Sequence, residues 1–515
     1  MPGADLRSVV PASEWAAPES ADAAWAGLAL AGVTADSRAV RPGFLFAALP
    51  GARADGRAFI AEAVARGACA VLAPPGTAWP AGVPPRPLIE DPEPRRRLAL
   101  LAASLAGPQP AVIAAVTGTN GKTSTVEFLR QIWTAGGQPA ASLGTLGLRT
   151  SAPAASQPPG QTPPPPTPLP QGERERTGAS SLTTPDPVAL AETLADLARA
   201  GIGHAAMEAS SHGLAQFRLD GVRLAGAGFT NLTRDHLDYH GTEAAYRAAK
   251  LRLFDTLLPV GAPAVANADM DPATLEALRA IAARRKLDLR TVGTGGTALR
   301  LIAARPRADG QDLTVEAGGR RREIPLPLPG GFQAENALVA AVLAEALGER
   351  AALDRLPALT GVRGRLELVA RLANGAAAYV DYAHTPDALA RALAALRPHT
   401  SGRLIVVFGA GGDRDRGKRP LMGAAAARGA DLAIVTDDNP RSEDPAAIRA
   451  SILAGCPGAI EIGPRAAAIA AGLAALGPGD VLVVAGKGHE AGQIVGAAVL
   501  PFDDAAVIRA LAGVG

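Results

Sequence analysis

Apolar strand-like segments that end in polar motifs and lead into helices recur along this chain, and this alternation constrains its fold most. One such segment is AVIAAVTG at residues 111–118, which runs into a helix-like stretch from Ser124 to Trp133. Four more follow residue 349, in AAAYVDYAHTPDALARALAAL, GRLIVVFGAGG, LAIVTDDNP and DVLVVAGKGHE. Strands and helices that alternate at this spacing form parallel, doubly wound sheets, which bind ligands where their strands end. The sequence therefore predicts an α/β protein.

The length of 515 residues and the distribution of the motifs predict three domains. We place them at residues 1–108, 109–348 and 349–515. A proline-rich insertion at about 151–180 interrupts the central domain, with nine prolines between residues 153 and 170. Proline lacks the N–H group that helices and sheet ladders need, so we expect a disordered, exposed surface insertion rather than a docking motif.

Composition excludes several classes of function. Hydrophobic residues make up 48% of the chain but aromatic ones only 3%, so the cores must be built from Ala, Leu and Val. The net charge of +2 gives no electrostatic case for nucleic-acid binding. Cys69 and Cys456 have no metal-ligand spacing and indicate a reducing compartment. Since we find neither a signal-like N-terminus nor a run near the ~20 apolar residues of a membrane span, we expect a cytoplasmic protein.

Lysine is rare in this chain, and four of its five lysines lie in motifs that look chemical. Arginine supplies the other 46 of the 51 basic residues. Lysine is therefore retained mainly where a guanidinium cannot replace an ammonium, which is compact and can lose its proton. Lys286 in ARRKLDL has the plain interpretation of a solvated helix position. The other four are Lys122 in TGTNGKTST, Lys250 in AAYRAAKLRLF, Lys418 in GGDRDRGKRP and Lys487 in AGKGHE.

The segment from Thr117 to Thr123 has the pattern of a phosphate-binding loop. It lies between an apolar strand and a helix start, where backbone N–H groups and the helix dipole favour a phosphate. In this pattern Lys122 reaches the β- and γ-phosphates and the Thr123 hydroxyl holds Mg²⁺. The first glycine of the general pattern would fall at Val116 or Thr117 and is missing. The strand–loop–helix context still favours nucleotide binding over a chance match.

A second polar segment, MEASSHGLAQFRLDG, follows a predicted strand at residues 207–221. Glu208 at the strand end is a hard oxygen ligand suited to Mg²⁺. Ser210, His212, Gln216 and Arg218 form a polar cluster in an otherwise apolar chain. An ordinary helix start with capping serines explains the same residues equally well.

A third segment, FTNLTRDHLDYHGTEAAYRAAKLRLF, places Lys250 two turns into a helix that begins at Thr242 as its N-cap. A lysine that burial keeps neutral can react with CO₂ to form a carbamate, in effect a long carboxylate, and arginine cannot. Beside His236 such a group could hold a second Mg²⁺. The usual alternative is a solvated surface lysine, which the scarcity of lysine in this chain weakens.

The segment GAGGDRDRG at 409–417 follows a strand and superficially resembles a dinucleotide-binding loop. Its glycine spacing does not fit GxGxxG. The basic residues Arg414, Arg416, Lys418 and Arg419 suit anionic carboxylates better, so we reject the dinucleotide interpretation.

Together these motifs resemble those of the Mur ligases of peptidoglycan synthesis, in particular the diaminopimelate-adding members. The resemblance spans residues 34–490, and the family's phosphate loop is shortened in the same way as here. The proline-rich insertion departs from the family pattern but falls between the motifs. The segments that carry the resemblance are TGTNGKTST, TNLTRDHLDYHG, AAKLR, GRLE (364–367), DYAHTPDAL (381–389), GGDRDRGKRP, DDNPR and GKGHE.

The resemblance implies an N-terminal UDP-sugar-binding domain, a central P-loop ATPase-like parallel-sheet domain and a C-terminal Rossmann-like domain that binds an amino acid. It implies an ATP-dependent amide ligase that adds meso-diaminopimelate to UDP-N-acetylmuramoyl-L-alanyl-D-glutamate through an acyl phosphate. Mg²⁺ would be the cofactor and ATP a co-substrate. We expect a monomer that binds neither nucleic acid nor membrane.

The family's functional residues carry over to matching positions of this sequence. Those implied for catalysis are Lys122, Lys250, Glu208 and His236, and Mg²⁺ would be bound by Thr123, Glu208, His236 and carbamylated Lys250. ATP would be bound by Gly118, Thr119, Asn120, Gly121, Lys122, Thr123, Ser124, Asn336, Arg365 and Asp381. The UDP-sugar dipeptide would be bound by Ser37, Thr183, Thr184, Ser210, Gln216 and Arg218, and diaminopimelate by Arg414, Asp438, Asn439, Arg441, Gly486 and Glu490.

Three alternatives remain open at this stage. A lysine-adding relative would use the same chemistry. A folylpolyglutamate synthetase-like ligase shares the phosphate loop but should lack SSHGLAQFR and DNPR together, and this chain has both. A scaffold that binds nucleotide without turnover is disfavoured by Lys122, Glu208, His236 and Lys250.

Overall fold

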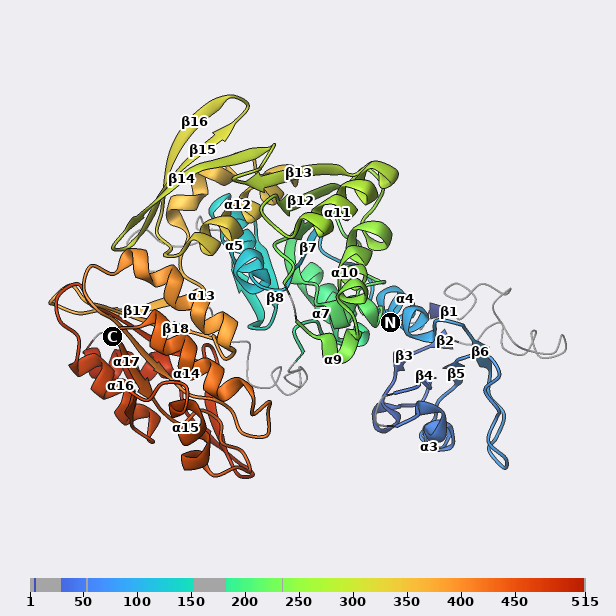
Figure 1. The fold of residues 1–515 in the computed structure, drawn as a ribbon. Helices are drawn as coiled ribbons and strands as arrows, with labels where there is room; N and C mark the ends of the chain where they lie inside the picture. Colours follow the sequence, from blue (N-terminus) through green and yellow to red (C-terminus); the bar gives the residue numbers. More distant parts are fainter. Residues whose placement is uncertain (1–3, 6–28, 52–53, 152–181, 234, 514–515) are drawn as a thin grey trace. The chain divides into compact units, whose positions relative to one another are not determined.

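The computed structural model describes residues 4–5, 29–51, 54–151, 182–233 and 235–513. The expected insertion at about 151–180 therefore lies almost wholly outside the described residues. The chain, drawn as a ribbon in Figure 1, groups into two compact units. One contains residues up to 122, 129–290 and 343–350, and the other contains 123–128, 291–342 and 351 onwards.

The first sheet of the first unit is small and entirely parallel, with strand order β3-β4-β5-β6. Alternate strand residues point to opposite faces, so Leu45 and Leu72 pack on α4 while Phe46 and Val71 pack on α3. The elements of this part are β1 Ala4–Asp5, β2 Ala29–Leu30, β3 Gly32–Thr34, η2 Ser37–Ala39, β4 Phe44–Ala47, η3 Gly56–Phe59, α3 Ile60–Ala65, β5 Ala70–Ala73, β6 Leu88–Glu90 and α4 Pro94–Ala106.

Six adjacent strands of a ten-stranded sheet lie wholly in the first unit, in the order β12-β11-β7-β10-β8-β9, with β7 between β11 and β10. All neighbours among these six pair in parallel except the β8–β9 hairpin. The elements are β7 Val112–Thr117, α5 Lys122–Ala135, β8 Ala140–Gly144, β9 Gly147–Ser151, α7 Pro187–Arg199, β10 His204–Glu208, α8 Ser211–Ala215, β11 Gly226–Phe229, α9 Leu237–His240, α10 Glu243–Arg252, the π-helical turn η5 Leu253–Leu257, β12 Pro263–Asn267, α11 Pro272–Arg285 and β13 Asp288–Gly293.

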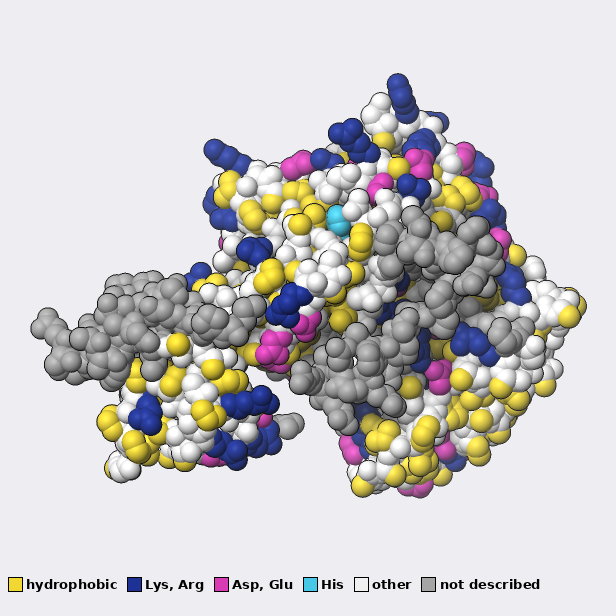
Figure 2. Space-filling view, turned by 180° about the vertical axis from the view of Figure 1, so that it is seen from behind, with side chains coloured by type: hydrophobic (Ala, Val, Ile, Leu, Met, Phe, Trp, Pro, Cys, Tyr) yellow, Lys and Arg dark blue, Asp and Glu magenta, His cyan; other side chains and the backbone are white. Residues whose placement is uncertain are grey.

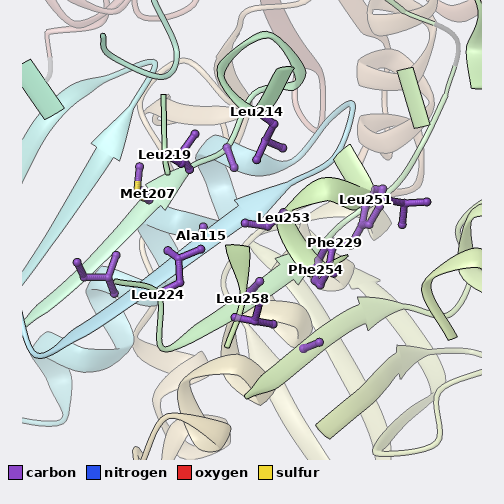
Figure 3. Packing of buried hydrophobic residues seen from close by; sticks show 14 of the residues in the cluster. Ala115, Met207, Leu214, Leu219, Leu224, Phe229, Leu251, Leu253, Phe254 and Leu258 are labelled. Carbon is purple, nitrogen blue, oxygen red and sulfur yellow. The ribbon is translucent and has the colours of Figure 1, made fainter. Parts of the chain in front are cut away.

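One face of this sheet is covered by α7, α10, η5 and α11. The side chains between the layers are small or aliphatic, apart from Tyr246, Phe229 and Phe254. Figure 3 shows part of this cluster, including Phe229 and Phe254. Phe229 and Phe254 stack with their ring centroids 5.8 Å apart. This core is therefore built mainly from Leu and Ala, as predicted, whereas Val, which the composition also predicts, is absent from its buried residues.

The second unit contains an antiparallel meander, β14 Leu299–Arg307, β15 Gly310–Ala317 and β16 Arg320–Leu326. Helix α12 Gly331–Ala346 follows the meander, and η6 Ala352–Ala358 comes after it.

The C-terminal sheet has the strand order β17-β18-β22-β19-β20-β21, and all its pairs are parallel except β17–β18. This confirms the predicted parallel sheet after residue 349. The elements are β17 Glu367–Arg371, β18 Ala377–Asp381, α13 Pro386–Leu396, η7 Arg397–His399, β19 Leu404–Phe408, α14 Lys418–Gly429, β20 Leu432–Val435, α15 Pro445–Leu453, β21 Ile460–Glu461, α16 Arg465–Ala474, β22 Val481–Ala485, β23 Gly492–Val495, β24 Ala498–Pro501 and α17 Asp504–Ala512.

Helices cover both faces of the C-terminal sheet. Val406 and Val483 face the side of α13, α14 and α15, while Val407 and Val484 face α16 and α17. A buried ion pair joins the last two helices, because Arg465 Nε and Nη2 donate to the two carboxylate oxygens of Asp504 at 2.7 Å each. Strands buried on both faces explain the unbroken apolar runs in the sequence.

The surface carries mixed charge. On the face shown in Figure 2, the dark blue Lys and Arg side chains lie among magenta Asp and Glu side chains, in keeping with the net charge of +2. Among the described residues, no helix is long and apolar enough to cross a membrane.

Candidate active site

The predicted phosphate loop connects β7 to α5, at the end of a strand buried on both sides. Gly118 has φ +149°, and a Cβ there would lie 1.9 Å from Thr230 Oγ1. Only glycine fits this position, because any side chain would collide with the neighbouring loop. The loop therefore exposes backbone where a phosphate can approach, and α5 begins directly after it at Lys122.

The loop is held against the segment that follows β11. Thr119 N donates to Asn231 O at 2.9 Å, and Asn120 N donates to Asn231 Oδ1 at 3.0 Å. Thr230 Oγ1 donates to Asn120 O at 2.6 Å. These bonds fix the backbone of Gly118 to Gly121 before any ligand arrives.

Two lysines meet at a single carbonyl of the loop. Lys122 Nζ donates to Gly118 O at 2.9 Å and to Thr119 O at 2.8 Å. Lys250 Nζ donates to the same Gly118 oxygen at 2.7 Å, although it is 132 positions away in the chain. The structure thus brings together two of the four lysines that the sequence singles out.

Lys250 is buried, with 1% of its surface exposed. It lies in α10, whose N-cap is Thr242, as predicted; the Thr242 hydroxyl accepts from Ala245 N at 3.2 Å. Burial lowers the pKa of Lys250 well below its usual value, and the nearby charge of Lys122 lowers it further. The ammonium lies 4.6 Å from the centre of the Tyr246 ring. A solvated surface role is therefore excluded, and the neutral amine is favoured.

His236 is half exposed and begins α9 with φ +51°. Its neighbours form an aromatic group that the sequence analysis only partly anticipated: the ring of His212 lies 4.9 Å from that of His236 and 4.1 Å from that of Tyr239. Burial lowers the pKa values of His212 and His240, so both favour the neutral imidazole. The buried Nε2 of His240 has no hydrogen-bond partner among the described residues.

Glu208 ends β10 and is 1% exposed. Its Oε1 accepts from Thr145 N at 2.7 Å, and its Oε2 accepts from Thr145 Oγ1 at 3.2 Å. A carboxylate can accept further bonds at both oxygens, so Glu208 keeps capacity for a cation. Thr145 is a contact that sequence reasoning missed, because it lies in the β8–β9 turn with no motif around it.

Two of the three residues available to Mg²⁺ offer oxygen, the donor atom that this ion prefers, and the third offers nitrogen. Glu208 offers a carboxylate, Thr123 in the first turn of α5 a hydroxyl, and His236 an imidazole. Mg²⁺ is usually held by one or two carboxylates and substrate phosphates rather than by a complete protein cage. Among the described residues, no group of three or more His, Cys, Asp or Glu could hold a metal by itself. The donors therefore fit an ion that arrives with a nucleotide.

Four of the residues expected to bind the sugar dipeptide are linked in one hydrogen-bonded chain next to Glu208. Thr184 Oγ1 donates to Glu208 O at 2.9 Å and lies 3.0 Å from Ser210 Oγ. Arg218 donates to Thr184 O at 2.7 Å and to Gln216 Oε1 at 2.6 Å.

Ser210 is also the N-cap of α8, since its hydroxyl accepts from Gly213 N, so the plain capping interpretation holds as well. Thr183 is joined to the same region, because its hydroxyl accepts from Thr145 Oγ1 at 3.4 Å. Ser37 lies apart in the small sheet, where it is buried and donates to Glu62 Oε2 at 3.0 Å.

The remaining residues expected to bind ATP lie in the second unit. Asp381 ends β18 and accepts from Leu366 N and Ala383 N at 2.7 and 2.8 Å. Burial raises the pKa of its carboxyl group. The Arg365 guanidinium lies 4.6 Å from the centre of the Tyr382 ring. Asn336 is buried in α12 and contacts Gln333.

Most residues expected to bind diaminopimelate gather at the carboxyl ends of β20 and β22. Asn439 Nδ2 donates to Glu490 Oε2 at 3.0 Å. A Cβ at Gly486, which has φ +117°, would lie 2.5 Å from Asp438 Oδ2, so the Asp438 carboxylate requires a glycine there. Fully buried Lys487 contacts both Asn439 and Glu490.

Arg441 lies in the same loop and takes φ +51°. Its Nη1 donates to Gly412 O at 2.8 Å, and its N–H donates to Ile494 O at 3.1 Å. Asp444, the nearby carboxylate in this segment, caps α15 by accepting from Ala446 N.

The basic residues of GGDRDRGKRP divide into different roles. Arg419 and Arg416 pair with Glu443, and the hydrogen bond from Arg419 lowers the pKa of Glu443 to about 2. Both arginines thus bind a carboxylate of the protein itself. Lys418 donates to His384 O at 2.9 Å. Arg414 is exposed and donates to Asp413 O at 3.3 Å, which leaves its other donors able to face a ligand.

Three family models match this chain: the Mur ligase family catalytic domain over residues 29–104, the Mur ligase middle domain over 116–344, and the Mur ligase glutamate ligase domain over 364–488. The chain therefore belongs to the Mur ligase family, whose members are ATP-dependent ligases with a three-domain α/β fold.

Two curated relatives are similar over nearly the whole chain. A protein of Caulobacter vibrioides is 57% identical over 94% of this chain and 96% of its own length. One of Rhizobium meliloti is 52% identical over 95% of both chains. Each is named UDP-N-acetylmuramoyl-L-alanyl-D-glutamate–2,6-diaminopimelate ligase.

Solved structures agree with this family. One of a UDP-N-acetylmuramoyl-L-alanyl-D-glutamate–2,6-diaminopimelate ligase has a TM-score of 0.70 and 33% identity, and covers 100% of this chain and 99% of its own. The folylpolyglutamate synthase of Mycobacterium tuberculosis, solved with ADP, has a TM-score of 0.57 at 21% identity, over 76% of this chain and 91% of its own. The second likeness shows a shared fold alone.

Proposed function

We propose that this protein is the ATP-dependent ligase that joins meso-diaminopimelate to UDP-N-acetylmuramoyl-L-alanyl-D-glutamate in peptidoglycan precursor synthesis. The observation that carries the proposal is the pairing of two sites within one chain. A phosphate loop with Lys122 and Lys250 on one carbonyl serves ATP. A polar site at the ends of β20 and β22 serves a diamino acid. Curated relatives that are named for this activity and are more than 50% identical to this chain support the assignment.

The first chemical step transfers the γ-phosphoryl group of ATP to the free carboxylate of D-glutamate and gives an acyl phosphate and ADP. Lys122 lies at the loop carbonyls and can swing toward the transferring group, where its charge stabilises the transition state. The backbone N–H groups from Gly118 to Gly121 hold the phosphates. Mg²⁺ would neutralise charge at the phosphate oxygens. The residues that would hold it are Thr123, Glu208, His236 and the carbamate of Lys250.

Lys250 contributes in modified form. Its neutral amine attacks CO₂ through nitrogen, a C–N bond forms, and one proton leaves to solvent, so that the side chain ends in a carbamate anion. The low pKa that burial gives Lys250 maintains the neutral amine that this reaction needs. The carbamate then places negative charge beside Lys122, where the two lysine side chains otherwise donate to the same carbonyl oxygen.

In the second step an amino group of diaminopimelate attacks the acyl phosphate carbon and the C–N bond of the amide forms. The C–O bond to phosphate breaks, inorganic phosphate leaves with the bonding electrons, and the nitrogen releases one proton to solvent. The nucleophilic amine must be neutral when it attacks. Because the acyl phosphate hydrolyses in water, the site must exclude solvent while it exists.

Recognition of the amino acid depends on its two ends. Arg414 and Arg441 provide guanidinium groups that match a carboxylate, and Glu490 provides a carboxylate for the distal ammonium. L-Lysine lacks the distal carboxylate and would leave those arginines unpaired. The nucleotide sugar and its dipeptide would be bound by Ser37, Thr183, Thr184, Ser210, Gln216 and Arg218. We further propose that the enzyme works as a cytoplasmic monomer.

A phosphate-release assay with UDP-N-acetylmuramoyl-L-alanyl-D-glutamate and ATP tests the proposal. We expect turnover with meso-diaminopimelate and a kcat/KM for L-lysine lower by about 10⁴-fold. Equal use of L-lysine would refute the substrate but leave the ligase class intact. Turnover with a folate and L-glutamate in place of these substrates would refute both.

A further inference from the structure

Lys487 lies at the centre of the proposed amino-acid site, yet none of the roles above uses it. Its side chain is 0% exposed. Its ammonium donates to Asn439 Oδ1 at 3.2 Å, to Glu490 Oε2 at 3.2 Å and to the carbonyl oxygen of Gly492. Three acceptors match the three protons of a lysine ammonium, so each proton has a partner.

This arrangement fixes two side chains at once. Asn439 Oδ1 accepts from Lys487 and from Ile494 N, at 3.2 and 2.9 Å, while Asn439 Nδ2 donates to Glu490. The amide orientation of Asn439 is thus determined by donors on one side and a carboxylate on the other. Lys487, Asn439 and Glu490 form a closed triangle of hydrogen bonds.

The triangle leaves one oxygen of Glu490 for a ligand. Lys487 and Asn439 both bond to Oε2, so neither occupies Oε1. The Glu490 side chain is 35% exposed, in contrast to the buried Lys487. The carboxylate is therefore fixed on its buried side and open on the other.

We propose that Lys487 is a positioning residue that holds Asn439 and Glu490 in the geometry that receives the distal ammonium of the amino-acid substrate. The inference deepens the proposed function, on which the identity of that substrate rests. Lys487 compensates the charge of Glu490 from behind, so that the carboxylate stays fixed without a ligand. A site held in advance loses less entropy when its substrate binds.

The same geometry explains why lysine occurs here in a chain with 46 arginines. The three acceptors converge on one nitrogen, whereas a guanidinium spreads five donors over a plane. A fully buried position has no room for the larger group without displacing Asn439 or Glu490.

The test measures the KM values of Lys487→Met for all three substrates. Methionine has a similar length and no charge. We expect the KM for diaminopimelate to rise roughly 10- to 100-fold, because a displacement of about 1 Å in such a site costs that much. The KM values for ATP and the UDP-sugar dipeptide should change less than 2-fold.

Arg403→Met is the matched control. Arg403 pairs with buried Asp480 at the opposite end of the same sheet, before β19 begins. Its loss should leave all three KM values within 2-fold. A rise in the KM for diaminopimelate in this control as large as that in Lys487→Met would overturn the inference, because any lost ion pair in the domain would then have the same effect.

A double-mutant cycle with Glu490→Gln separates positioning from general damage. If Lys487 acts through Glu490, the double variant should have nearly the same KM for diaminopimelate as Glu490→Gln alone. The inference would be overturned if the two substitutions multiplied each other's effect on the KM for diaminopimelate. An unchanged KM for diaminopimelate in Lys487→Met, or equal rises in KM for all three substrates, would overturn it too. Lys487→Gln serves for the same comparison if the methionine variant does not fold.

Failure of the proposed substrate is a separate result. If the wild-type enzyme uses L-lysine in place of diaminopimelate, the substrate assignment is wrong, and the KM for L-lysine in Lys487→Met then decides the role of Lys487.

Discussion

The buried ion pair between Arg465 and Asp504 gives the strongest prediction about stability. Both side chains are 0% exposed, and two bonds of 2.7 Å join them. Asp504→Ala would leave a guanidinium buried without its anion. Removing one partner of such a pair costs about 3–5 kcal/mol. Arg465 keeps its bond to Ala485 O at 3.0 Å, so we expect a value near 3 kcal/mol.

The assay is hydrogen exchange of the peptide that contains α17, since global unfolding of a chain with several domains does not report on one helix. A loss of about 3 kcal/mol raises the open fraction of α17 on the order of 100-fold. Asp503→Asn is the matched control. This neighbour caps α17 and pairs with partly exposed Arg363, and asparagine keeps the cap, so the change should cost less than about 1 kcal/mol.

A double variant completes the argument. Arg465→Met with Asp504→Ala should cost at least about 2 kcal/mol less than the sum of the two single changes, because no unpaired charge remains. The reasoning is refuted if Asp504→Ala costs no more than Asp503→Asn, or if the two changes simply add.

Four further predictions concern the proposed function. Lys122→Ala should lower kcat by about 10²- to 10³-fold with an unchanged circular dichroism spectrum, and near-normal phosphate release would refute the phosphate-loop assignment. Lys250→Arg should be inactive and Lys250→Ala partly rescued by a small carboxylate such as formate in the phosphate-release assay; full activity of the arginine variant would exclude a carbamate. Arg441→Ala should raise the KM for diaminopimelate far more than the KM for ATP, and should lower the ratio of kcat/KM for diaminopimelate to that for L-lysine. An equal fall in kcat/KM for both amino acids would count against a contact between Arg441 and the distal carboxylate. Deletion of residues 153–170, which lie outside the described residues, should change the melting temperature and activity little, and lost expression would show that the segment packs.

Local features were predictable from the sequence because neighbouring residues determine them. The phosphate loop requires only a buried strand, a glycine turn and a helix start, all within about twenty residues. The N-cap at Thr242 follows from a hydroxyl placed before a helix, and the structure confirms it. The parallel C-terminal sheet followed from repeated strand and helix segments and is confirmed too.

Contacts between segments that lie far apart in the sequence could not be predicted in this way. The bond of Lys250 to Gly118 joins residues 132 positions apart, and that of Lys487 to Asn439 joins residues 48 apart. The rarity of lysine identified both residues but not their partners. Arg419 shows a similar limit, because its motif predicted a carboxylate partner but did not identify that partner as Glu443 of the protein itself.

The strand order of the C-terminal sheet has a consequence for synthesis on the ribosome. β22 lies between β18 and β19, yet it is the last strand of this sheet to be made. Until residues 481–485 leave the exit tunnel, β18 and β19 lack the neighbour that joins them, and their apolar edges stay open to other chains. A nascent chain that stalls before residue 481 should therefore carry two separate half-sheets and need a chaperone. The amino-acid site then forms in one late event, when β22 inserts and brings Gly486, Lys487 and Glu490 into place together.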